Sequence, residues 1–201
     1  ATALAGGGWW PDFRNKLIWQ VGILFGSVNS VYFSCNAFLP GHLTAAGRPD
    51  LISATLTALN FGQIPASFAL LVVVGRLQRR ALPFIISGAL MLSCLAGLVS
   101  TASGWTVAFA GVLGFLTAVV LTLGFALPPL LSAPAGVARM SAAMFTISYS
   151  EALVVAVLSG AAWDFGGSPQ FAFLPIAISA LPLLFVPAAL PFHRPRDAAT
   201  L

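Results

Sequence analysis

FAFLPIAISALPLLFVPAAL, residues 171–190, contains one polar side chain, the hydroxyl of Ser179. About 20 consecutive apolar residues are enough for an α-helix to cross the hydrocarbon core of a bilayer. Side chains of this kind also tolerate direct contact with lipid. The stretch therefore predicts a membrane-spanning helix.

Five further apolar segments of similar length precede this one. The six predicted spans are residues 17–39, 51–74, 81–100, 105–127, 141–163 and 171–190. The connections between them are short and hold the Gly, Pro and charged residues that end helices. We expect an all-α membrane protein with a cytoplasmic linker at residues 1–16, a six-helix transmembrane domain at 17–192 and a cytoplasmic tail at 193–201.

The composition agrees with a membrane protein. Hydrophobic residues make up 59% of the chain and charged residues 7%, whereas about a quarter of a soluble domain is charged. The net charge of +4 does not indicate nucleic acid, because the basic residues lie in small groups between apolar runs and form no dense stripe. Cys35 and Cys94 both lie within apolar runs and are expected to be packing residues without a metal or cofactor.

The distribution of basic residues predicts the orientation, since Lys and Arg in short loops stay on the cytoplasmic side. If the N-terminus is inside, only Arg48 of the nine basic residues lies outside. We therefore expect a multi-pass protein of the bacterial inner membrane with both termini cytoplasmic. The other eight basic residues are then cytoplasmic: Arg14, Lys16, Arg76, Arg79, Arg80, Arg139, Arg194 and Arg196.

Polar side chains recur at helical spacing on the first, second and fifth spans, and polar groups are costly against acyl chains. We expect these stripes to converge on one cavity that binds a small polar solute through neutral groups. The alternative is hydrogen bonding that only holds the helices together, at about 0.6 kcal/mol per contact. The candidate substrate contacts are Asn29, Tyr32, Asn36, Asn60, Gln63 and Tyr149.

Glu151 is the one acid well inside a predicted span, within SYSEALVVAV, residues 148–157. No Lys or Arg lies at matching depth to neutralise it, and an ionised carboxylate there costs at least about 2.5 kcal/mol. Two interpretations stay open. Glu151 is either a protonated structural acid hydrogen-bonded to a neighbour such as Asn29, Tyr32 or Asn60, or a proton-coupling site that faces a wet cavity.

Three longer stretches resemble the C-terminal half of a major facilitator superfamily transporter, in its cyanate and nitroimidazole permease branch. FGSVNSVYFSCNAFLPGHLTAAG (25–47) and LTALNFGQIPASFALLVVVGRLQRR (56–80) are similar to the seventh and eighth helices, with Leu39-Pro40 and GQIPAS (62–67) in matching places. SAAMFTISYSEALVVAVLSGAAWDFGGSP (141–169) resembles the eleventh helix. Two features depart from the branch: the basic loop GRLQRR (75–80) lacks an acidic residue, and Glu151 stands where an apolar residue is usual.

The resemblance implies a fold and a function. The fold would be half of a superfamily bundle, built as a 3+3 inverted repeat, and substrate would bind between two such halves near the midplane. The function would be alternating-access transport of a small polar or anionic solute. The partner would be an N-terminal six-helix half, or a second copy of this chain. The first is favoured, because self-pairing would require one surface to build both walls of the site.

Two other classes of function are alternatives. An intramembrane enzyme is disfavoured because His42 and His193 lie in a loop and in the tail, and because HExxH and Gly-x-Ser-x-Gly are absent. A channel or a structural subunit without transport of its own remains the alternative if the polar stripes only join helices. Arg76, Arg79 and Arg80 are expected to set topology and brace the cytoplasmic loop, and not to contact substrate.

Overall fold

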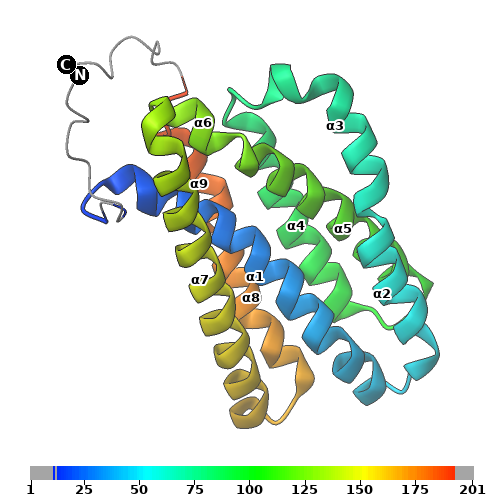
Figure 1. Ribbon diagram of the computed structural model, residues 1–201. Coiled ribbons are helices and arrows are strands. Elements are labelled where there is room, and N and C mark those ends of the chain that lie inside the picture. Colours follow the sequence, from blue (N-terminus) through cyan, green and yellow to red (C-terminus); the bar gives the residue numbers. More distant parts are fainter. Residues whose placement is uncertain (1–10, 12, 193–201) are drawn as a thin grey trace, which may run out of the picture.

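Six long helical segments make up the described part of the chain, residues 11 and 13–192, in the computed structural model shown in Figure 1. No strand occurs among these residues. All six segments are long and apolar enough to cross a membrane, which confirms the all-α class and the expectation of six candidate spans. The segments are Lys16–Ala45, Pro49–Leu77, Leu82–Ser100, Gly104–Leu131, Pro134–Gly166 and Pro169–Ala189.

Some spans are single helices and others are divided. The first, third and fifth contain α1 (Lys16–Ala45), α4 (Leu82–Ser100) and α7 (Val137–Gly166). The second is divided into α2 (Ile52–Phe61) and α3 (Gln63–Leu77), and the fourth into α5 (Gly104–Phe125) and the short α6 (Leu127–Leu131). The sixth is divided into α8 (Phe173–Ala180) and α9 (Pro182–Ala189).

Prolines account for the divisions in the second and sixth spans. Pro65 is the third residue of α3 and Pro182 the first of α9. Proline suits the first turn of a helix, where the backbone N–H would have no partner within that helix. The second span therefore breaks at Gly62, before Pro65, and the sixth breaks at Leu181, before Pro182. Pro40 is accommodated inside α1.

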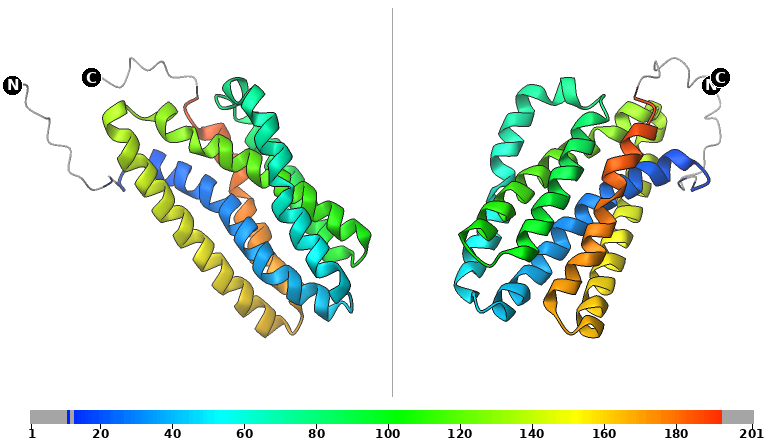
Figure 2. Two further views of the ribbon diagram at one scale, coloured as in Figure 1. Left: turned by 45° about the vertical axis from the view of Figure 1, so that its right-hand side comes forward. Right: turned by 180° about the vertical axis from the view of Figure 1, so that it is seen from behind.

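α1 lies at the centre of the bundle and packs lengthwise against α7 (Figures 1 and 2). α2, α3 and α4 pack against α5, while the two parts of the sixth span take different neighbours. α8 packs on α1 and α7, whereas α9 packs on α4 and α1. The core between these helices includes Phe25, Phe84 and Met91, all at most 2% exposed.

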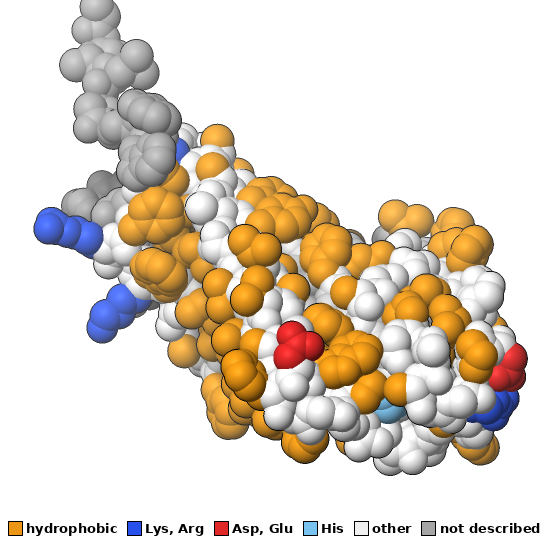
Figure 3. Space-filling model, turned by 90° about the horizontal axis from the view of Figure 1, so that it is seen from below, with side chains coloured by type: hydrophobic (Ala, Val, Ile, Leu, Met, Phe, Trp, Pro, Cys, Tyr) orange, Lys and Arg blue, Asp and Glu red, His pale blue; other side chains and the backbone are white. Residues whose placement is uncertain are grey.

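The second and fifth spans are the most open of the six. In the most apolar stretch of 18 residues of each span, 17% of the second span and 33% of the fifth are buried. The corresponding share of the first span is 67%. Their outward side chains are large and apolar, including Phe68, Leu71 and Val72 on α3 and Leu153 and Val157 on α7. Figure 3 shows one end of the molecule, where hydrophobic side chains lie between backbone and uncharged polar groups and charged groups are few. The outward faces of the two open spans suit acyl chains or further helices, and not water.

A basic side chain ties two loops together at the α1–α2 end of the bundle. Arg48 donates from Nε and Nη2 to both carboxylate oxygens of Asp50, at 2.9 and 2.8 Å. Its Nη1 donates to the backbone carbonyl of Ala102 at 2.9 Å, in the turn between α4 and α5. The guanidinium thereby joins the loop after the first span to the loop after the third. We call this arrangement the Arg48 clasp.

Candidate functional site

A hydrogen-bonded cluster joins α1 to α2 and contains three of the predicted substrate contacts. The Tyr32 hydroxyl donates to Asn60 Oδ1 at 2.6 Å, and Asn60 Nδ2 donates to Asn36 Oδ1 at 3.0 Å. Asn36 Nδ2 in turn donates to the Tyr32 carbonyl at 2.9 Å. All three side chains are half-buried. We call Tyr32, Asn36 and Asn60 the Asn60 cluster.

The local sequence places Asn60 beside the break in the second span. Tyr32 and Asn36 are four residues apart, so they share one face of α1. Asn60 lies two residues before Gly62, where α2 ends and α3 begins. A Cβ atom on Gly62 would overlap the carbonyl oxygen of Gly111 on α5. The glycine thus lets two backbones approach at the point where the helix changes direction.

Gln63 begins α3 next to this break and is half-buried. Among the described residues its side-chain amide makes no hydrogen bond, while its backbone carbonyl accepts from Ser67 Oγ at 3.0 Å. The amide is therefore available to a ligand. Gln63 is only three residues from Asn60, but its side chain makes no hydrogen bond to the Asn60 cluster.

Asn29 takes a different position from the other predicted contacts on α1. Its side chain is 5% exposed, and its Nδ2 donates to Ser148 Oγ on α7 at 2.7 Å. This buried bond holds the two long helices together. Asn29 is thus placed in the α1–α7 interface and apart from the Asn60 cluster.

Tyr149 belongs to an aromatic group on the flank of α7. It is 55% exposed and stacks on Phe145, with ring centroids 6.2 Å apart and planes 18° apart. Its ring also lies 6.3 Å from that of Phe33 on α1. No hydrogen bond to its hydroxyl occurs within the described residues. Tyr149 is available for contact from outside the six helices.

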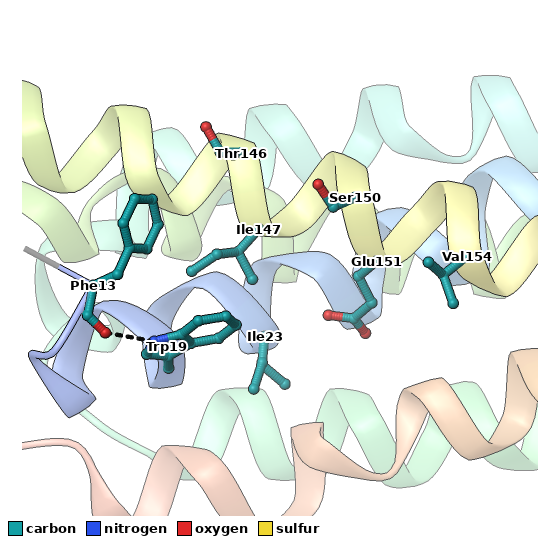
Figure 4. Close-up of a pocket in the computed structure, with 8 residues that line it drawn as sticks. All are labelled: Phe13, Trp19, Ile23, Thr146, Ile147, Ser150, Glu151 and Val154. Carbon is teal, nitrogen blue, oxygen red and sulfur yellow. Dashed lines mark hydrogen bonds between the residues drawn. The ribbon is translucent and has the colours of Figure 1, made fainter. Parts of the chain in front are cut away.

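The side chain of Glu151 lies between α7 and α1 (Figure 4). Its carboxyl group packs on Gly26, where an added Cβ atom would overlap it. Its Oε2 atom is buried without a hydrogen-bond partner among the described residues. The hydroxyl of Ser27 lies beside the carboxyl group and donates to the Ile23 carbonyl at 2.9 Å. The expected partners Asn29, Tyr32 and Asn60 bond elsewhere, and Glu151 joins none of them.

Tyr149 and Glu151 consequently face different ways. Two residues correspond to a turn of about 200° around an α-helix. Tyr149 packs with Phe33 and Phe145, whereas Glu151 borders a groove with Trp19 and Ile23 on the other flank of α7. The structure does not bring the three polar stripes to one point.

The basic loop is remote from all of these groups. Arg76 is in the last turn of α3, and Arg79 and Arg80 lie in the turn before α4. All three side chains are exposed. Arg76 follows Gly62 by 14 positions, which is about 20 Å along a helix. A bracing role is compatible with this position, and contact with a ligand at the Asn60 cluster is not.

A pair of glycines on α1, absent from the predicted site residues, shapes its contact with α7. Gly22 and Gly26 are four residues apart, and they receive Ile147 and Glu151, which have the same spacing on α7. Small residues at this spacing let helices in a membrane pack closely. The signal was present as Gly-x-x-x-Gly at residues 22–26.

The described residues contain no group of three or more His, Cys, Asp or Glu side chains that could hold a metal ion. The expected loop position of His42 is wrong: the residue lies in the last turn of α1, because this helix continues to Ala45. Its side chain is 4% exposed, and its ring packs edge-on against Phe173. His193 lies outside the described residues. The chain matches no known protein-family model, no curated protein and no solved structure.

Proposed function

We propose that this chain is a six-helix half of a secondary carrier of the major facilitator type, which moves a small polar or anionic solute by alternating access. The observation that carries the proposal is the Asn60 cluster, which places a phenol and two amides among apolar helices beside a break in the second span. Divided helices with freed polar groups at membrane depth are the usual construction of substrate sites in carriers. Asn60 and Gln63 lie on either side of that break.

The openness of the second and fifth spans supports a partner half. These spans expose Phe61, Ile64 and Phe68 on one side and Tyr149 and Leu153 on the other. A second six-helix bundle placed over them would cover these groups and complete a cavity in front of Tyr149 and Gln63. The solute would then contact neutral amides and phenols, which hold a small polar molecule without trapping it by charge.

Conformational change follows from the same arrangement. One bundle would rock against the other, and the polar groups would face each side of the membrane in turn. The orientation with both termini in the cytoplasm belongs to this proposal. So does the inverted 3+3 repeat of the six helices.

Glu151 is the candidate for proton coupling within this proposal. It lies near the middle of α7, 14 residues after Val137 in a helix of 30. Ionisable groups at such depth are costly and are commonly functional. Because Glu151 borders the α1–α7 groove, a proton would reach it by a different route from the one the solute takes.

A structural subunit without transport is the second candidate. It is favoured because the side chains of the Asn60 cluster already form hydrogen bonds with one another inside the chain. In that case Tyr32, Asn36 and Asn60 hold α1 and α2 together and bind nothing.

Flux measurements on liposomes that contain only this chain test the carrier proposal. We expect no uptake from a panel of small anions beginning with cyanate, because one half lacks the second wall of the site. The measurement compares monomeric protein with protein that forms dimers. The mass of each sample in detergent verifies its state. Saturable flux through the monomer alone would overturn the proposal of an incomplete half.

A further inference from the structure

A lateral groove runs between the N-terminal part of α1 and the middle of α7 (Figure 4). Its volume is about 520 Å³. This volume lies in the range of small-molecule sites. Phe13, Trp19 and Ile23 form one wall, and Ile147, Glu151 and Val154 belong to the other. The Trp19 indole is fixed by a hydrogen bond of 2.8 Å from Nε1 to the Phe13 carbonyl.

The sixth span leaves this groove uncovered. α8 packs against both α1 and α7, but α9 packs against α4 and α1. The walls are accordingly open, with Trp19 46% exposed and Val154 54% exposed. In a bilayer this opening faces acyl chains. A ligand would therefore enter sideways from the membrane, on the flank of α7 opposite Tyr149.

The chemistry of the groove is apolar and aromatic, with one acid. Among the described residues that line it, Glu151 is the single titratable side chain. Its Oε2 has no hydrogen-bond partner among the described residues, and the Ser27 hydroxyl beside it donates to the Ile23 carbonyl. The part of the chain that the structure describes places no Lys or Arg in the lining to neutralise the acid. A carboxylate of this kind is complementary to a cation, and aromatic faces attract cations as well.

We propose that this groove binds an amphipathic organic cation, a quaternary ammonium, phosphonium or protonated amine on an aromatic or branched hydrocarbon body. The hydrocarbon body would lie against Phe13, Trp19 and Ile23, and the positive centre would lie beside Glu151. A lipid acyl chain is the competing occupant. An acyl chain would pack against the apolar walls equally well, but it carries no positive charge to interact with the Glu151 carboxylate.

Equilibrium dialysis with the purified full chain in detergent micelles tests this site directly. Tetraphenylphosphonium and tetraphenylborate carry the same four phenyl groups with opposite charges, so the pair separates charge recognition from apolar binding. Empty micelles supply the background. We expect saturable binding of tetraphenylphosphonium and at least about tenfold weaker binding of tetraphenylborate. Equal affinity for the two ions, or no saturable binding of the cation, would overturn the proposal in favour of a lipid groove or an empty one.

Three substitutions locate the binding. Glu151→Gln is expected to weaken phosphonium binding at least about tenfold, whereas Asp164→Asn removes an exposed acid from the same helix and should leave binding unchanged. Ile23→Trp fills the groove and should also weaken binding. Wild-type affinity in Glu151→Gln would refute the site. The comparison of the two ions needs no variant, so it decides the question even if a variant fails to fold. The measurement involves no transport, and its failure leaves the carrier proposal standing.

Discussion

The carboxyl group of Glu151 packs on Gly26, one helical turn beyond the contact between Ile147 and Gly22. The acid is therefore part of a close approach between the two longest helices. This relationship connects helix packing to the one acid well inside a span among the described residues, and it leads to the first prediction.

Gly26→Ala should destabilise the bundle by about 1–3 kcal/mol, because the new methyl group overlaps the Glu151 carboxyl group. Gly160→Ala on α7 is the matched control, since its Cβ would meet nothing within 4 Å. Thermal unfolding in detergent gives the comparison. In a Glu151→Ala background the cost of Gly26→Ala should shrink, and an equal cost in both backgrounds would show that the carboxyl group is not the obstacle.

Gly62→Ala should destabilise the chain more than Gly111→Ala, although the two glycines face each other. A methyl group on Gly62 would overlap the Gly111 carbonyl oxygen, which belongs to the backbone and cannot turn away. A methyl group on Gly111 finds its nearest atom at 3.7 Å, an ordinary contact. Unfolding temperatures of the two variants check this order. The reverse order would mean that α2 and α3 are not held against α5 as described.

Cysteine accessibility should distinguish the predicted solute contacts from one another. In a version with Cys35 and Cys94 replaced by Ser, cysteines at positions 36, 60, 63 and 149 are expected to react with a water-soluble thiol reagent. A cysteine at Asn29 should stay unreactive, because that side chain is 5% exposed and bonded to Ser148. Ser179, 8% exposed in the sixth span, supplies a second unreactive position. Labelling at 29 and 179 with none at the other four positions would contradict the assignment of faces.

Replacement of Arg76, Arg79 and Arg80 by Gln should disturb insertion or switching and leave solute binding intact. The reason is their exposed position about 20 Å along α3 from the break. Protease protection of the loop in membrane vesicles reports orientation, and solute protection of a cysteine at Asn60 reports binding. Lost binding in correctly oriented protein would assign the arginines to the site.

Glu151→Gln in the complete carrier should abolish accumulation driven by a pH gradient and spare exchange of solute between the two sides. Glutamine keeps the size of the side chain but cannot titrate. Uptake by vesicles with and without an imposed gradient, beside an exchange assay without a gradient, separates the two activities. Unchanged pH-driven uptake would leave Glu151 as a structural acid.

The positions of the spans could be predicted from hydropathy because crossing a bilayer requires a fixed length of apolar residues. The i, i+4 spacing of Tyr32 and Asn36 also predicted a shared face correctly. The fate of Asn29 could not be predicted. It lies on nearly the same side of α1 as Asn36, but about two turns away, where α7 is the neighbouring helix. The neighbour of a helix at a given height depends on long-range packing. The spacing of residues within one helix does not indicate that neighbour.

Glu151 illustrates the same limit. A helical wheel groups it with Ser148, and Ser148 does face α1, where it accepts from Asn29. The two glycines at 22 and 26 decide where the carboxyl group goes, since they open space on α1 at the heights of Ile147 and Glu151. Their Gly-x-x-x-Gly spacing would have indicated a close crossing, but not the identity of the partner helix.

The Arg48 clasp has a mechanical consequence. It fastens the turn between α4 and α5 to the turn after α1, so the first four spans share one fixed end. Helices that are joined at one end of a bundle can separate only at the other end. The second span changes direction at Gly62, so if these helices separate we expect α3 to move relative to α2 at this break.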